Sequence, residues 1–415
     1  MGKRRRGDTQ LEQRLLVLVT LGLVAFGLVM VFSATSASAT LGEGDPMRFL
    51  VRQGLYALAG LTALALLSRF DYHRLRALAP ILIVVALAAC VAVLLLAPPI
   101  NGARRWFLVG PVSLQPSELA KVAVLVWACA VLARRPAPRT MNELMKPVGL
   151  AVAVFAGLIV IQPDLGTTIT LVLTIGGVLL VSGTPLRLLA LASSFAIGFG
   201  LLAIWMEPYR RDRVLSFLDP WQDAEGAGFQ TVQAMIGIGS GGITGEGLGQ
   251  GIQKINFLPE AHTDMIFAVI GEELGLIGST LVIAAFAVFA WAGFGIALAC
   301  RDPFGKRLAA GVTTLVSAQA LVNLAAVLGV APLTGIPLPF VSYGGSSLLM
   351  LLAAVGVLLN IAVNDRVVEA RMPDRSRGNG RSRPARARRG GGAARARSDR
   401  DVRRHTRSRR VAAGP

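Results

Sequence analysis

Two charged side chains lie three residues apart at the start of an apolar stretch, where ionisable groups are costly and point to function. The stretch opens Gln115-Pro116-Ser117, and Glu118 and Lys121 follow. On a helix these two residues share a face and can form an ion pair. The pair either orients its helix or positions a neighbouring catalytic group, and the spacing alone leaves both alternatives open.

A further carboxylate, Asp264, lies where a long polar segment meets another apolar stretch. Partial desolvation at such a boundary makes a carboxylate more basic, which suits a general base. An aspartate before a helix also serves as an N-cap, so this alternative stays open. Farther along, Glu272 and Glu273 are adjacent in an apolar helix and point to different faces, so at least one is expected to face a polar cavity.

Arginines and small polar residues gather in the segments between apolar stretches. Guanidinium groups match the oxygens of phosphates, so the arginines predict a polyanionic ligand. Four are candidates for binding a pyrophosphate, namely Arg104, Arg105, Arg210 and Arg211. His262, Ser342 and Tyr343 are further candidates for substrate binding, although the small residues around Ser342 also suit helix packing.

The elements that carry these residues are predicted to be membrane helices. The 415 residues are 53% hydrophobic and only 16% charged, too apolar for one soluble core. A span needs about 20 apolar residues, and runs of this kind recur along the chain. The ten expected spans are near 15–35, 49–68, 78–97, 117–134, 147–162, 165–182, 186–205, 266–292, 309–330 and 343–364. The fifth and sixth are short and could instead form a kinked hairpin or a re-entrant pair.

Basic residues set the expected orientation, because loops near the spans collect Lys and Arg on the cytoplasmic side. They place both chain ends in the cytoplasm and a large extracytoplasmic loop at about 206–265, between the seventh and eighth spans. The predicted organisation is a basic N-terminal tail (1–14), an all-α polytopic membrane domain (15–364) and a disordered Arg-rich tail (365–415). The first span is interpreted as a retained anchor rather than a cleaved signal peptide, because its apolar run is long.

The net charge of +18 does not indicate a nucleic-acid-binding protein. Residues 365–415 hold 17 arginines and 5 acidic residues, without interleaved aromatic residues for base stacking. Such a tail is expected to lie near anionic lipid headgroups. The 3 cysteines and 3 histidines have no paired spacing, so the sequence predicts no metal site and no tightly bound cofactor.

Ordered motifs across about 330 residues resemble the SEDS family of bacterial cell-wall polymerases. The motifs are Val29-Met30-Val31-Phe32-Ser33-Ala34, Asn101-Gly102-Ala103-Arg104-Arg105-Trp106, Gln115-Pro116-Ser117-Glu118 with Lys121, Gln162-Pro163-Asp164-Leu165-Gly166-Thr167, Pro259-Glu260-Ala261-His262-Thr263-Asp264 and Pro339-Phe340-Val341-Ser342-Tyr343-Gly344-Gly345-Ser346-Ser347. The first and fifth of these, with Leu248-Gly249-Gln250 and Gln253-Lys254, are more similar to the division members of the family than to its elongation members.

The resemblance implies a peptidoglycan glycosyltransferase of the bacterial cytoplasmic (inner) membrane, multi-pass and placed at the division septum. Its substrate would be lipid II, polymerised into β-1,4 glycan strands on the outer face. It would work with a class B penicillin-binding protein as transpeptidase and with other divisome proteins. The resemblance carries the catalytic role over to Asp264, which we expect to act as the base, with Glu118 and Lys121 as support. The sequence leaves open whether a loosely bound divalent cation (Mg or Mn) bridges Asp264 and the pyrophosphate.

Three alternatives are kept beside this interpretation. A flippase would move lipid II across the membrane without chemistry, and helices with polar groups at mid-membrane suit it. A scaffold that only recruits the transpeptidase would not need the outer Asp and Arg residues. A polymerase of the elongation type would carry out the same chemistry away from the division site.

Overall fold

The computed structural model describes residues 6–40, 46–100, 102–110, 112–255, 258 and 260–371. Its elements, in chain order, are α1 (Arg6–Thr40), α2 (Pro46–Arg69), α3 (His73–Leu96), β1 (Phe107–Val109), β2 (Val112–Leu114), α4 (Pro116–Leu132), α5 (Met141–Leu144), η1 (Met145–Gly149), α6 (Leu150–Ile161), α7 (Leu165–Val181), α8 (Leu186–Trp205), α9 (Pro208–Leu218), α10 (Phe229–Ser240), α11 (Ile266–Ala299), α12 (Pro303–Val327) and α13 (Gly345–Arg371).

Every expected span coincides with a helix, which confirms an all-α polytopic membrane protein. Eight helical segments of the described chain are long and apolar enough to cross a membrane: Gln10–Ser36, Pro46–Arg69, His73–Leu96, Met141–Ile161, Leu186–Trp205, Ile266–Ala299, Pro303–Val327 and Gly345–Asn364. The apolar helix α7 and the helix α4 have 17 residues each, or about 26 Å at 1.5 Å per residue. The ten-span topology itself stays a prediction.

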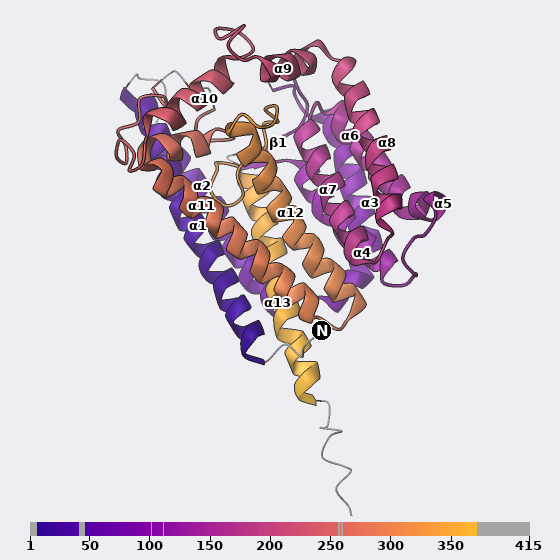
Figure 1. Cartoon of the computed structure of the whole chain (residues 1–415). Coiled ribbons are helices and arrows are strands. Elements are labelled where there is room, and N and C mark those ends of the chain that lie inside the picture. The colour runs from indigo at the N-terminus through magenta and orange to yellow at the C-terminus, as the bar shows by residue number, and fades with distance from the viewer. Residues whose placement is uncertain are drawn as a thin grey trace, which may run out of the picture. The chain divides into compact units, whose positions relative to one another are not determined.

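The helices run between two ends of the bundle (Figure 1). α1 begins and α13 ends at one end, and the labels of α9, α10 and β1 lie toward the opposite end. The expected extracytoplasmic loop, which contains α9 and α10, and the strand β1 therefore lie toward the end away from the start of α1 and the end of α13. We refer to their end as the outer end.

Burial differs strongly among the helices. Of the most apolar window in each, 72% of the residues of α12 and 78% of those of α13 are buried, against 11% of those of α8. α13 packs closely on α2, where a side chain at Gly356 would collide with the backbone of Leu64. α12 lies among α11, α7 and α4. The polar residues on α12 are therefore enclosed by protein rather than by lipid.

Three local features of the outer end were not part of the sequence prediction. The expected large loop contains the helices α9 and α10. The segment before α4 forms an antiparallel hairpin in which Phe107 pairs with Leu114. α11 is broken at Gly275, whose φ of +62° and ψ of −156° are not helical. The broken turn brings backbone from other segments into the outer end of α11.

The fifth and sixth expected spans are two separate helices, α6 and α7, joined by a tight turn. Asp164 accepts a hydrogen bond from the backbone N–H of Thr167 at 3.0 Å and so caps α7. Its other carboxylate oxygen accepts from the amide of Gln115 at 3.0 Å. This second bond fixes the turn beside the start of α4.

The expected tails lie mostly outside the described residues. Helix α1 begins at Arg6, so the helix includes much of the predicted N-terminal tail. α13 extends to Arg371, and the predicted Arg-rich tail beyond it, residues 372–415, lies outside the described part of the chain.

Candidate active site

Asp264 lies on the outer segment that leads into α11, two residues before Ile266. Its backbone carbonyl accepts a hydrogen bond from the Asn323 amide of α12 at 2.7 Å. Its carboxylate accepts from the Thr263 hydroxyl at 3.2 Å. These bonds hold Asp264 beside the outer end of α12; its role as a base stays a prediction.

Burial raises the pKa of Asp264 from 3.8 to about 6. Hydrogen bonds from its own backbone N–H and from Thr263 lower the pKa, as does the positive charge of Arg213 on α9, and the charge of Glu260 raises it. The net effect is a carboxylate that is ionised at neutral pH and more basic than an ordinary aspartate, which is the property required of a general base.

Two amides on one face of α12 hold the segment that follows the helix. Gln319 donates to the carbonyl of Pro337 at 3.0 Å, and Asn323 donates to the carbonyl of Ile336 at 2.8 Å. Because Asn323 also binds the carbonyl of Asp264, α12 joins residues 336–337 to the candidate base. The two amides share a face of α12 because they are four residues apart in the sequence.

The Glu118–Lys121 pair is present and buried. Lys121 Nζ lies 2.9 Å from Glu118 Oε1, with 1% and 4% of the two side chains exposed. Lys121 also donates to Gln319 at 2.9 Å. Through Gln319 the pair is connected to the 336–337 segment, so the predicted support for the Asp264 site has a physical path. In the described structure no hydrogen-bond donor reaches the other carboxylate oxygen, Glu118 Oε2, which is also buried.

The four arginine candidates occupy different environments. Arg105 donates to the carbonyls of Gln162 and Pro163, both at 2.6 Å, at the end of α6. Arg210 donates to the carbonyl of Val160 at 2.8 Å. Both arginines therefore hold one helix end. A guanidinium has five N–H donors, so these bonds leave others for a ligand.

Arg104 and Arg211 are less constrained. Arg104 is exposed and donates to the carbonyl of Leu94 at 3.2 Å. Arg211 lies 6.0 Å from the ring of Trp205 at the end of α8. Arg213, which the predicted pyrophosphate set did not include, is the arginine whose charge acts on Asp264. Its guanidinium also donates to the carbonyl of Leu333 at 3.4 Å.

His262 and Tyr343 are brought together, although they are far apart in the sequence. Their ring centroids are 5.4 Å apart, and each packs against Phe49 of α2, at 4.9 Å and 5.5 Å. Burial lowers the pKa of His262, so at neutral pH it offers a neutral imidazole rather than a cation. The three rings form an aromatic cluster, of which His262 lies two residues before Asp264 in the sequence.

Ser342 is buried and structural in its contacts. Its hydroxyl accepts from the backbone N–H of Leu338 at 2.8 Å, and its carbonyl accepts from the Gln53 amide at 3.1 Å. Only 3% of the residue is exposed. These bonds fix the turn that places Tyr343 beside His262.

Sequence reasoning missed the partners of the adjacent glutamates on α11. Glu272 accepts from the backbone N–H groups of Ile252 and Gln253, at 2.6 Å and 3.1 Å. Glu273 pairs with Lys254 at 2.7 Å and accepts from Ser33 of α1. Both carboxylates bind protein groups, whereas the sequence analysis expected at least one of them to face a polar cavity. The sequence signal for these contacts was the presence of two adjacent acids in an apolar helix, because such acids need hydrogen-bonding partners within the membrane domain.

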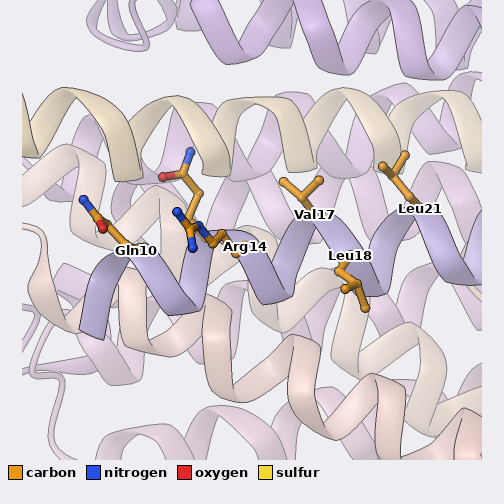
Figure 2. Close-up of a pocket in the computed structure, with 6 residues that line it drawn as sticks. Gln10, Arg14, Val17, Leu18 and Leu21 are labelled. Carbon is orange, nitrogen blue, oxygen red and sulfur yellow. The ribbon is translucent and has the colours of Figure 1, made fainter. Parts of the chain in front are cut away.

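An open surface cavity of about 660 Å³ lies along α1 (Figure 2). Its lining comes from the first half of that helix: Gln10, Gln13, Arg14, Val17, Leu18 and Leu21. This part of α1 lies toward the end of the bundle opposite the outer segments (Figure 1). The cavity is therefore separate from the candidate active site.

Within the described residues, no group of three or more His, Cys, Asp or Glu side chains could hold a metal ion. The buried acids named above are instead bonded to lysine, hydroxyl or backbone N–H groups. Among the acids of this region, Asp264 has its pKa raised by burial to about 6.

Fold and site together define a polytopic membrane protein in which a buried network of Glu118, Lys121 and Gln319 lies near Asp264, an aspartate with a raised pKa. Comparison with known proteins identifies the class. The family described as "Cell cycle protein", which groups FtsW, RodA and SpoVE, matches residues 13–367.

Curated relatives and solved structures agree with this match. The "Probable peptidoglycan glycosyltransferase FtsW" of Geobacter metallireducens is 41% identical, over 84% of this chain and 93% of the relative. The "Stage V sporulation protein E" of Bacillus subtilis is 38% identical, over 84% and 96%.

A structure described as "Structural coordination of polymerization and crosslinking by a peptidoglycan synthase complex" is similar, with a TM-score of 0.71 and 33% identity over 84% of this chain and 97% of that one. The rod shape determining protein RodA of Thermus thermophilus has a TM-score of 0.63 and 30% identity, over 84% and 96%. The chain belongs to the FtsW/RodA/SpoVE family.

Proposed function

We propose that the protein is a peptidoglycan glycosyltransferase that polymerises lipid II into β-1,4 glycan strands at the outer face of the bacterial cytoplasmic membrane, during septal wall synthesis. The observation that carries the proposal is the placement of Asp264 at the outer end of α11, bound to Asn323, with its pKa raised to about 6 by burial. Family membership and the names of the relatives support the same activity.

In the proposed reaction, Asp264 accepts the proton of the 4-hydroxyl of the acceptor GlcNAc as that oxygen attacks C1 of the donor MurNAc. The bond from C1 to the pyrophosphate breaks, and the polyprenyl pyrophosphate leaves with the electron pair. A single displacement inverts the anomeric centre, which converts an α-linked donor into a β-linked polymer. Charged donors for the departing pyrophosphate would come from Arg104, Arg105, Arg210 and Arg211.

The Glu118–Lys121 pair would act indirectly. It is fully buried and tied through Gln319 to the segment beside Asp264. The carbonyl of Pro337 is a hydrogen-bond partner of this network, so the pair would keep the floor of the site in place. His262 and Tyr343 would offer aromatic faces to the sugars.

The proposed partners are a class B penicillin-binding protein and other divisome proteins. One of the similar solved structures is a peptidoglycan synthase complex that coordinates polymerization with crosslinking, which supports a partner of this kind. The cytoplasmic position of both chain ends and the location at the septum are part of the proposal. We further propose that no cofactor is tightly held and that any divalent cation binds loosely with the substrate.

Purified protein with its transpeptidase partner and labelled lipid II tests the proposal. Wild-type protein is expected to make glycan strands. Asp264→Asn removes general-base assistance, so its rate is expected to be about 10²–10⁴-fold lower. Asp212→Asn, an exposed aspartate on α9, is the control and should retain the rate. Strand synthesis by Asp264→Asn at the wild-type rate would contradict the assignment.

The same protein in vesicles separates the alternatives. Movement of labelled lipid II across the membrane without polymer would support a flippase. Neither movement nor polymer, with recruitment of the partner intact, would support a scaffold. Septal or lateral localisation of a fluorescent fusion in growing cells distinguishes the division role from the elongation role.

A further inference from the structure

The outer part of α11 is not a self-sufficient helix. At Gly275 the chain leaves helical geometry, which frees carbonyl and N–H groups from the usual ladder. Polar backbone inside a membrane domain must find partners in the protein. The segment that supplies these hydrogen-bond partners is therefore the segment that packs against the break in α11.

A glycine-rich segment fills the break. The N–H groups of Glu246 and Gly247 donate to the carbonyls of Glu272 and Glu273, both at 3.0 Å, and the carbonyl of Gly242 accepts from the N–H of Leu276 at 2.9 Å. Side chains at Gly241 or Gly245 would collide with the backbone of α11. Residues 241–247 therefore pack against the broken turn through their backbone.

The two glutamates then hold the residues that follow this segment. The carboxylate of Glu272 accepts from consecutive N–H groups at Ile252 and Gln253. The carboxylate of Glu273 binds Lys254 Nζ at 2.7 Å, and the exposed fractions of these two side chains are 0% and 2%. Because both partners are withdrawn from water, loss of either leaves an uncompensated buried charge.

Ser33 of α1 completes the contact. Its hydroxyl lies 2.8 Å and 2.7 Å from the two carboxylate oxygens of Glu273 and 3.2 Å from Lys254 Nζ. We call Ser33, Lys254 and Glu273 the clasp. The clasp joins α1, α11 and the outer segment at one buried point.

The clasp closes a loop that contains Asp264. Residue 254 is fixed to Glu273, and the same chain reaches α11 again at Ile266, so both ends of the segment 254–265 are attached to the first turns of one helix. Inside the segment, Leu258 donates its N–H to the carbonyl of Gln253 at 2.8 Å. The attachments at Lys254 and at the start of α11 restrict the chain on either side of Asp264.

We propose that Lys254 is a positioning residue for Asp264, acting through its buried pair with Glu273 and Ser33 to hold the carboxylate at the outer end of α12. The inference rests on the proposed function, since it assigns Lys254 a role in the reaction of Asp264. Lys254 itself is buried and paired, so it acts through the loop and not on the substrate. The groups that face Asp264 are Thr263 and Glu260 from its own segment, Arg213 from α9 and Asn323 from α12.

Lys254→Met tests the proposal in the labelled lipid II assay. A misplacement of a catalytic group by about 1 Å costs on the order of 10²-fold in rate, so a fall of about 10- to 100-fold in kcat is expected, with KM nearly unchanged. Water would also reach Asp264 more easily, so the acid limb of the pH–rate profile should move from about 6 toward lower pH. Lys254→Arg, which keeps the charge, should retain most of the rate.

Asn360→Ala is the matched control for loss of stability. Asn360 is also buried and binds the backbone of Tyr72 and Ser68 at the other end of the bundle. It should lower the melting temperature without moving the acid limb. If Lys254→Met behaves like Asn360→Ala, with an unshifted pH profile and no excess loss of kcat, the clasp has only a structural role and the proposal is wrong.

Ser33→Ala keeps the experiment decisive if Lys254→Met does not fold. It removes one partner of Glu273 but leaves the ion pair, so a fall in kcat of about threefold with a small acid-limb shift in the same direction is expected for one lost hydrogen bond. An unchanged rate and profile would contradict the proposal. These results can be distinguished from those of Asp264→Asn. If Asp264→Asn loses activity but the clasp variants do not, the positioning role of Lys254 is wrong and the proposed function stands.

Discussion

Two buried lysine–glutamate pairs occupy the outer half of the protein, and they are built differently. Lys121 and Glu118 are three residues apart on α4, and the pair reaches the rest of the site through the side chain of Gln319. Lys254 and Glu273 come from different segments, and Ser33 adds a third. The first pair organises one helix face, whereas the second joins three parts of the chain. The difference indicates that the first supports the floor of the site and the second sets the position of the loop above it.

Among substitutions in the two pairs, Lys121→Met is expected to have the largest effect. It leaves Glu118 charged and buried and removes the donor to Gln319, and breaking a buried pair in this way costs about 3–5 kcal/mol. Strand synthesis should fall by about 10²-fold or more, with a lower melting temperature. The measurements are the labelled lipid II assay and thermal unfolding in detergent. Activity near the wild-type value would show that the α4 pair does not support the site.

The pH–rate profile separates the two pairs by what they hold. The base must be deprotonated, and its pKa is raised to about 6, so the rate should fall about tenfold per pH unit below this value. Lys121→Met should lower the rate without moving this limb, whereas Lys254→Met should move it down.

Arg213→Gln gives the sign of the pH effect. The charge of Arg213 lowers the pKa of Asp264, so its removal should raise the acid limb above pH 6. Glu260→Gln should have the opposite effect, since the charge of Glu260 raises this pKa. A limb that neither substitution moves would mean that another group titrates in the assay.

Much of this arrangement was predictable from local spacing. Glu118 with Lys121, and Gln319 with Asn323, lie on common faces because the helix repeat brings residues three and four apart together. Asp264 was predicted from the boundary between polar and apolar segments. The shared helix faces follow from neighbours along the chain and the helical repeat, whereas the catalytic role of Asp264 was implied by the family resemblance.

The rest depends on long-range contacts that no local pattern contains. Ser33 and Glu273 are 240 residues apart in the sequence, and the break at Gly275 is visible only once the glycine segment is seen to enter it. Likewise, the guanidiniums of Arg105 and Arg210 hold the end of α6. The presence of arginines predicted a phosphate ligand, but the sequence could not show that their guanidinium groups bind these backbone carbonyls.

The smallest expected effect compares the neutral isosteres of the two acids. The carboxylate of Glu273 accepts from both Lys254 and Ser33, whereas the described donor to the carboxylate of Glu118 is Lys121. Glu273→Gln should therefore lower the melting temperature by a few degrees more than Glu118→Gln does. Equal shifts in thermal unfolding would indicate that the two pairs contribute alike to stability.

The broken outer part of α11 also has a consequence for biogenesis. Adjacent glutamates on a helix are costly to place in lipid without partners. Here the partner groups at residues 242–254 precede the helix in the chain, so they leave the ribosome before it. The order of the sequence thus supplies the counter-charge and the backbone donors before the acidic turn needs them. Exchanging the two segments in a permuted chain would remove that order of arrival while keeping the same contacts.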